Sequence, residues 1–241
     1  MILSNKHIAL TNYGSIESFQ ILKDFGATLH HFPMIDIVEN SNIKPFELSD
    51  FDYYIFTSKN GVNAFFNLDF VKEKKINTFC LGEKTKNELI ENGVEAIFVS
   101  NESYADNLIT ELLDNQMVVN KRVLLVLGNL ADNRIEEALS SICNVIRLDI
   151  YNTTLETTKK KDITNFLENR NTISIFTSPS SFQAFNNLYD VEKTTLVSIG
   201  TTTSKTIKSA GYVPEITSDV QTYDGISKAI INYYETKNIN I

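Results

Sequence analysis

Short runs of apolar residues alternate along the chain with longer segments in which apolar residues recur every three or four positions. The short runs are rich in β-branched and aromatic residues, which is typical of buried strands. The longer segments, such as the one with Ile135, Leu139 and Ile142, have helical spacing. This alternation predicts an α/β fold, with parallel sheets flanked by helices on both faces. The expected strands are residues 8–11, 53–57, 78–81, 96–99, 123–127, 172–177, 195–199 and 213–216.

The pattern also repeats. Residues 55–67 contain Ile-Phe-Thr-Ser, then Ala-Phe, then Asn, and residues 175–187 contain the same residues at the same spacing. After a shift of two positions, Gly, Thr, Gly, Ser and Asp at 82, 85, 93, 100 and 106 recur in order at 200, 203, 211, 218 and 224. The repeat indicates a duplicated α/β unit and therefore two similar domains.

A second, weaker repeat relates residues 6–37 to residues 121–150. Its first copy precedes the first copy of the stronger repeat, and its second copy lies between the two copies of that repeat. Each of these blocks can belong to either neighbouring half, so two consecutive domains and a domain insertion both remain open. Residues 32–39 and 145–154 break the alternation, because each is extended and places Asp between aliphatic residues. They favour the insertion, with a first domain of residues 1–33 plus 155–241 and a second of residues 40–146. Residues 34–39 and 147–154 are then paired linker strands, a two-stranded β-ladder.

Length and charge limit the function further. A chain of 241 residues is long enough for two domains that each bury a core. The formal net charge is -8, and no basic run exceeds residues 159–161. These features argue against nucleic acid or an anionic membrane as partner. No apolar run could span a bilayer, and residues 6 and 7 are polar where a signal peptide would be apolar, so the expected location is cytoplasmic.

The cysteines and histidines carry no recognisable motif. Cys80 and Cys143 lie in or beside apolar stretches without a CxxC partner, which predicts reduced thiols rather than a disulfide. The three histidines lack the spacing of a metal-binding motif such as HExxH. We therefore expect no metal site.

Hydroxyl residues and glycines follow several of the expected strands. Open parallel sheets bind ligands beyond the carboxyl ends of their strands, and two such edges that face each other would form a cleft. A helix that begins there offers free amides and hydroxyls to an anion. The same residue types are ordinary helix caps, so capping alone is the alternative at each position. The residues are Thr57, Ser58, Gly82, Asn129, Thr177, Ser178 and Gly200. Neither a P-loop nor a GxGxxG fingerprint is present, which disfavours a nucleotide-dependent enzyme.

These motifs together resemble the uroporphyrinogen-III synthase family over almost the whole chain. The resemblance is carried by residues 55–62, by Leu81-Gly82 with Thr85 and Gly93, by residues 127–130 and 148–151, and by residues 176–178 and 198–203 with Gly211. It implies two α/β domains joined by a two-stranded ladder, usually in a monomer. It also implies a lyase that converts hydroxymethylbilane to uroporphyrinogen III, with inversion of ring D and loss of water, in haem biosynthesis. No metal or organic cofactor is implied. A transient contact with the preceding enzyme of the pathway remains open.

The resemblance also assigns roles to residues. Tyr151 takes the position of the family's tyrosine, whose phenol would assist departure of the substrate hydroxyl; an aromatic packed on the ladder is the alternative. Substrate carboxylates would be bound by Ser58, Thr85, Ser103, Tyr104, Asn129, Leu130, Ser178, Thr202 and Thr203. The chain departs from the family at Thr11-Asn12-Tyr13, where many members carry an Arg-Pro pair after the first strand, so a role of that arginine in binding a substrate carboxylate does not carry over.

A non-enzymatic two-domain protein that binds a small polycarboxylate is the alternative function. Such a binder has no need for a phenol at the linker, and it would usually place an arginine on the carboxylate. Tyr151 and the hydroxyl residues around Thr203 therefore favour the enzyme.

Overall fold

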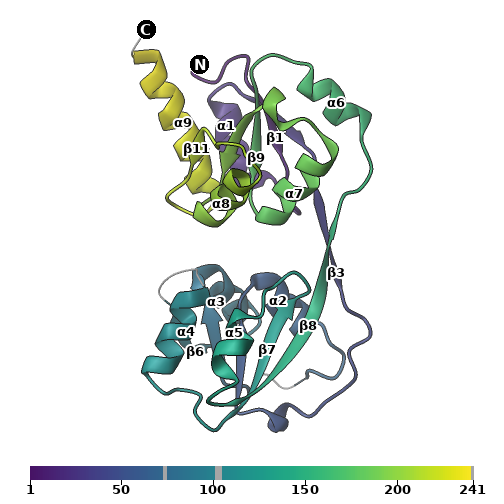
Figure 1. Cartoon of the computed structure of the whole chain (residues 1–241), viewed down its shortest axis with the longest axis vertical. Helices are drawn as coiled ribbons and strands as arrows, with labels where there is room; N and C mark the ends of the chain where they lie inside the picture. Colours follow the sequence, from purple (N-terminus) through teal and green to yellow (C-terminus); the bar gives the residue numbers. More distant parts are fainter. Residues whose placement is uncertain (73–74, 101–104, 240–241) are drawn as a thin grey trace. The chain divides into compact units, whose positions relative to one another are not determined.

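The computed structural model describes residues 1–72, 75–100 and 105–239. The chain forms two compact units (Figure 1). Unit 1 combines Met1–Asp36 with Thr154–Ile241, and unit 2 is Ile37–Thr153. Each unit is a parallel sheet flanked by helices, so the expected fold class is confirmed.

Unit 1 contains a five-stranded sheet in the order β11-β10-β9-β1-β2, in which every neighbouring pair is parallel. The strands are β1 (His7–Leu10), β2 (Thr28–His31), β9 (Thr172–Phe176), β10 (Thr195–Ser198) and β11 (Ile216–Thr217). The helices are α1 (Gln20–Asp24), α6 (Lys161–Leu167), α7 (Pro179–Leu188), α8 (Thr201–Ser209) and α9 (Tyr223–Ile239), with 3-10 turns η1 (Glu17–Phe19) and η3 (Val191–Lys193).

The sheet of unit 1 is buried on both faces because its strands alternate their side chains between two cores. Ile8 and Leu10 face the core that α1 and α9 cover. Ala9, between them, faces the core that α6, α7 and α8 cover. Both layers are visible in Figure 1.

Unit 2 contains a six-stranded sheet of order β3-β8-β7-β4-β5-β6, which is parallel except at its edge pair β3-β8. The strands are β3 (Ile35–Glu39), β4 (Tyr53–Phe56), β5 (Thr78–Leu81), β6 (Ala96–Ser100), β7 (Arg122–Gly128) and β8 (Asn144–Leu155). The helices are α2 (Lys59–Phe66), α3 (Gly82–Glu91), α4 (Ala105–Asp114) and α5 (Arg134–Leu139), with the 3-10 turn η2 (Leu48–Asp50). Tyr54 and Phe56 pack under α2 and α3, whereas Ile55 packs under α4 and α5.

Strands β3 and β8 carry the chain between the units. The Asn40 amide donates to the Ile150 carbonyl at 2.8 Å, and the Glu156 amide donates to the Met34 carbonyl at 2.9 Å. The partner's number falls as the residue number rises from 34 to 40, so the two strands are antiparallel. The extended pair expected for residues 34–39 and 147–154 lies within this ladder.

The strand orders explain the two repeats of the sequence. Unit 1 runs β2-β1-β9-β10-β11, and unit 2 runs β8-β7-β4-β5-β6. The first repeat matches β9, α7, β10 and α8 with β4, α2, β5 and α3. The second matches β1 and β2 with β7 and β8, which occupy equivalent places in the two sheets although they lie out of order along the chain.

Apart from strand ends that differ by about one residue, the strands expected from the sequence differ from the structure in two places. The strand expected at 213–216 is wrong: β11 begins at Ile216, and the Val213 side chain is 77% exposed in the loop before it. Strand β2 was missing from the list because it is an edge strand whose polar residues Thr28, His30 and His31 show no apolar run. Among the described residues, no helix has the length and apolar character needed to cross a membrane.

Candidate functional site

In unit 2, several of the expected site residues lie at one edge of the sheet. Strands β4, β5, β7 and β8 are parallel, so their carboxyl ends meet there. Ser58 follows β4, Gly82 follows β5, and Asn129 follows β7. Tyr151 lies on β8 opposite the last residue of β7.

Ser58 caps helix α2 and contacts Tyr151. Its backbone is extended, and its Oγ accepts a hydrogen bond from the Gly61 amide at 3.1 Å, as in an ordinary N-cap. The same Oγ lies 3.1 Å from the phenol oxygen of Tyr151. One hydroxyl therefore connects the start of the helix to the phenol.

The ring of Tyr151 rests on a glycine. A shift of register between Leu127 and Gly128 brings Gly128 opposite Tyr151. A Cβ on Gly128 would lie 2.4 Å from Cε2 and Cζ of the ring and 2.8 Å from its hydroxyl, closer than any real contact. The glycine of the Leu-Gly-Asn-Leu motif is therefore required to make room for the ring.

The environment keeps the Tyr151 phenol protonated. Burial raises its pKa above the usual value near 10, the hydrogen bond with Ser58 lowers it, and the charge of Asp149 raises it. Burial is the largest effect, so the net shift is upward. The phenol is neutral at physiological pH and can donate a hydrogen bond or a proton.

Asn129 is held by β8 rather than at a helix start. Its amide donates to the Tyr151 carbonyl at 3.1 Å, and its Oδ1 accepts from the Thr153 amide at 2.8 Å. The expectation that Asn129 opens a helix is wrong, because α5 begins only at Arg134. The adjacent Leu130 is 56% exposed.

The threonines of the helix starts differ in exposure. Thr85 in α3 and Thr203 in α8 are almost fully buried, whereas Thr202 is exposed. The Thr202 hydroxyl is thus the accessible one of the three. Ser103 and Tyr104, which the resemblance assigns to the substrate, lie outside the described residues.

In unit 1, Ser178 repeats the cap of Ser58 without a phenol. Its Oγ accepts from the Ser181 amide at 3.1 Å, and its own amide donates to the Ser181 Oγ at 3.3 Å, which completes a capping box. Its Oγ also lies 3.0 Å from Ser180 Oγ. Both serines are therefore helix caps, and only Ser58 also contacts a tyrosine in the part of the chain that the structure describes.

Two lysines at the same edge of unit 2 were not predicted. Lys59 is the first residue of α2, and Lys84 lies in the first turn of α3. Partial desolvation lowers the pKa of Lys84, and the charge of Lys59 lowers it further. A cation at a helix N-terminus opposes the helix dipole. A lysine directly after a capping serine is the sequence signal that could have identified Lys59.

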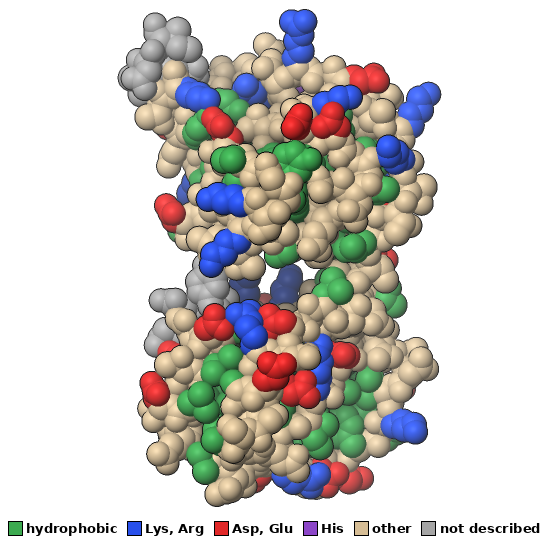
Figure 2. Space-filling model, viewed as in Figure 1, with side chains coloured by type: hydrophobic (Ala, Val, Ile, Leu, Met, Phe, Trp, Pro, Cys, Tyr) green, Lys and Arg blue, Asp and Glu red, His purple; other side chains and the backbone are tan. Residues whose placement is uncertain are grey.

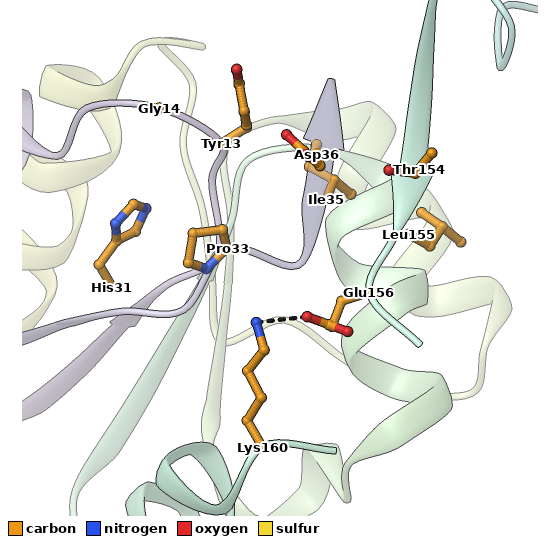
Figure 3. Close-up of a pocket in the computed structure, with 10 residues that line it drawn as sticks. All are labelled: Tyr13, Gly14, His31, Pro33, Ile35, Asp36, Thr154, Leu155, Glu156 and Lys160. Atoms are coloured by element: carbon orange, nitrogen blue, oxygen red, sulfur yellow. Dashed lines mark ion pairs between the residues drawn. The ribbon is translucent and has the colours of Figure 1, made fainter. Parts of the chain in front are cut away.

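Unit 1 contains a pocket of about 500 Å³ between the β1–α1 loop, the end of β2 and the segment that follows β8 (Figure 3). Lys160 and Glu156 point toward each other in it and form an ion pair of 2.6 Å. His31 donates from Nε2 to the Asn12 carbonyl at 3.0 Å, since a carbonyl can only accept. The positive charge of Lys160 is offset within the pocket. The predicted site residues do not line it.

Charge is mixed on the face drawn in Figure 2, where acidic and basic side chains are interspersed over each unit without a single basic patch. Together with the net charge of -8, this gives no large positive surface on that face to attract a polyanion. On that face an anion would be bound by local groups rather than by a large positive surface.

Fold and site together define a class: α/β proteins made of two duplicated parallel-sheet units, with capped helices at the carboxyl edges of the sheets. A profile of the family described as uroporphyrinogen-III synthase HemD matches residues 18–228. The chain belongs to this family, whose members are hydro-lyases of tetrapyrrole biosynthesis.

Solved structures show the same fold. Uroporphyrinogen-III synthetase from Helicobacter pylori is similar with a TM-score of 0.69 and 18% identity, over 95% of this chain and 99% of that one. A mutant uroporphyrinogen III synthase from Thermus thermophilus is similar with a TM-score of 0.64 and 15% identity, over 96% of this chain and 99% of that one. A search of curated proteins found no match.

Proposed function

We propose that this protein is a uroporphyrinogen-III synthase, which closes hydroxymethylbilane with inversion of ring D and loss of water. Family membership over residues 18–228 supports the reaction class. The observation that carries the proposal is the Tyr151 phenol, held neutral on Gly128 and beside Ser58 at the carboxyl edge of a parallel sheet.

Tyr151 is proposed to assist the departure of the substrate hydroxyl. A neutral phenol can donate a hydrogen bond to that oxygen as the carbon–oxygen bond breaks. The resulting azafulvene is attacked by ring D through a spiro intermediate, and the macrocycle closes. The hydroxyl and one proton leave as water. A positioned acid contributes about a hundredfold or more to the rate of such a step. Holding the linear substrate in a folded conformation contributes the rest of the rate enhancement.

Local groups are proposed to bind the eight carboxylates of the substrate. Hydroxyls and amides at the helix starts suit carboxylates, because helix N-termini favour anions. The proposed residues are Ser58, Thr85, Ser178, Thr202 and Thr203 at helix starts, Asn129 and Leu130 in the turn after β7, and Ser103 and Tyr104. Lys59 and Lys84 add positive charge at the carboxyl edge of unit 2.

The proposal includes no metal or organic cofactor and a cytoplasmic location. Hydroxymethylbilane closes spontaneously to the wrong isomer. A transient contact with the enzyme that makes it would shorten the time available for that side reaction.

The test is an assay in which hydroxymethylbilane is supplied fresh and the oxidised products are separated into isomers I and III. We expect isomer III to predominate. Isomer I alone, formed at the rate of the protein-free control, would contradict the proposal and leave a two-domain binder of polycarboxylates.

Tyr151→Phe tests the role of the phenol. We expect kcat to fall about a hundredfold if the phenol acts as the acid. Tyr54→Phe is the matched control, because Tyr54 is a buried tyrosine of the same unit whose hydroxyl donates to the Leu48 carbonyl at 2.7 Å. It should cost stability without changing kcat. Unchanged turnover in Tyr151→Phe would remove this residue from the chemistry.

A further inference from the structure

We propose that Ser58 is a positioning residue for Tyr151: its hydroxyl donates to the phenol oxygen and so directs the phenol hydrogen toward the substrate. The inference rests on the proposed function and deepens it. It also changes the role of Ser58, which the resemblance assigns to the binding of substrate carboxylates.

The hydrogen bonds around Ser58 carry the argument. Its Oγ has one hydrogen and two lone pairs, and one lone pair is used by the Gly61 amide at 3.1 Å. At the 3.1 Å contact with Tyr151, either hydroxyl can be the donor. If Tyr151 donated to Ser58, the phenol hydrogen would be occupied and could not reach a departing hydroxyl. Only donation from Ser58 leaves the phenol hydrogen for the substrate.

The start of helix α2 favours this direction. The Gly61 amide belongs to the first turn of α2, where unpaired amides give a partial positive charge. A hydroxyl that accepts from such an amide becomes a better donor, because hydrogen bonds in a chain polarise one another. The chain therefore runs from the Gly61 amide through Ser58 to Tyr151. It makes the phenol a stronger acid, in opposition to the effect of burial.

Gly128 fixes the other side of the ring. Its missing Cβ lets the ring lie where a side chain would be 2.4 Å away. The register shift at Leu127 and Gly128 places this gap opposite Tyr151. The phenol oxygen is thus held between a backbone surface and the Ser58 hydroxyl.

The repeat provides a comparison within the same chain. Ser178 caps α7 with the same 3.1 Å hydrogen bond, but its Oγ contacts Ser180 instead of a phenol. Capping therefore does not require the contact that Ser58 makes. Ser178→Ala removes a helix cap without touching Tyr151. It serves as the matched control for the pKa of Tyr151 but not for turnover, because Ser178 is itself a proposed substrate-binding residue.

The kinetic test is a double-mutant cycle of Ser58→Ala and Tyr151→Phe. It measures kcat for the formation of isomer III and KM for hydroxymethylbilane. In the wild-type background we expect Ser58→Ala to lower kcat by about two- to tenfold, the usual worth of one hydrogen bond, with KM little changed. In the Tyr151→Phe background it should have no further effect on kcat. Ser58→Thr keeps the hydroxyl and should restore kcat. An equal loss in both backgrounds, or a change in KM alone, would overturn the proposal and indicate a contact with the substrate.

A second measurement does not depend on turnover. With 3,5-difluorotyrosine at position 151, whose phenol titrates closer to neutral pH, fluorine NMR reports the pKa of that one phenol. Ser58→Ala should raise this pKa, because a donor to the phenolate is lost. Ser178→Ala should leave it unchanged. An unchanged pKa in Ser58→Ala would overturn the proposal.

The two measurements separate the two hypotheses. If the wild-type protein makes no isomer III but Ser58→Ala raises the pKa, the proposed function fails and the hydrogen-bond chain stands. If the protein makes isomer III but the cycle is additive and the pKa does not move, the proposed function stands and the positioning role is wrong.

Discussion

Gly128→Ala should destabilise the protein through a single contact with the Tyr151 ring. The added Cβ would lie 2.4 Å from Cε2 and Cζ, so the ring must move by about 1 Å to reach ordinary van der Waals distance. Gly128 is not among the glycines with positive φ, and its backbone therefore accepts alanine without strain. The steric contact is the main cost.

The magnitude follows from two opposing effects. Replacing glycine by alanine at a compatible position stabilises by about 0.4–1 kcal/mol through the unfolded chain. Overpacking costs about 1–3 kcal/mol. We expect a net loss of about 1–2 kcal/mol in the free energy of unfolding. The movement would also stretch the 3.1 Å contact with Ser58, and a displacement of this size can lower kcat by about a hundredfold.

Urea denaturation in three backgrounds tests this reasoning. In the Tyr151→Phe background the ring atoms remain, so Gly128→Ala should cost about the same. In the Tyr151→Ala background the ring is absent, and the change should become neutral or stabilise by up to about 1 kcal/mol. An equal cost in all three backgrounds would refute the reasoning, because the cost would then come from the backbone around Gly128.

Three further predictions concern other parts of the chain. Burial and, less strongly, the charge of His7 lower the pKa of His30 in the folded protein. In the unfolded chain this histidine takes up a proton near about pH 6.5. The contribution of His30 to the free energy of unfolding should therefore be fully present above about pH 6.5 and be lost as the pH falls below it. Thermal unfolding from about pH 7.5 to pH 5 measures this as the slope of Tm against pH. An equally steep slope in His30→Gln and in the wild-type protein would contradict it. Burial raises the pKa of Cys80 to about 12, with Glu83 adding to the effect, so its thiol should resist alkylation until the protein is unfolded in urea; rapid labelling of the native protein would show the assignment to be wrong. Lys84→Gln should raise KM for hydroxymethylbilane by about two- to fivefold, as expected for an exposed charge pair, and more strongly at low salt; a salt-independent KM would remove Lys84 from substrate binding.

The sequence by itself determined the local structure. Each strand–helix unit follows from apolar runs and helical spacing, and the repeat of residues 55–67 at 175–187 predicted two similar α/β domains. Ser58 and Ser178 stand where helix caps belong, and both are caps. These features are readable because a strand, a helix and a cap each depend on residues only a few positions apart.

Only the tertiary structure decided how the site is assembled. Ser58, Gly128 and Tyr151 lie on different elements, and their contact depends on the placement of β8 beside β7 and on a one-residue shift of register. A local pattern contains neither the order of strands nor their register, because both are chosen by packing between distant segments. For the same reason, the sequence indicated a tyrosine and a capping serine, while the glycine beneath the ring and the hydrogen bond between the two hydroxyls came from the fold.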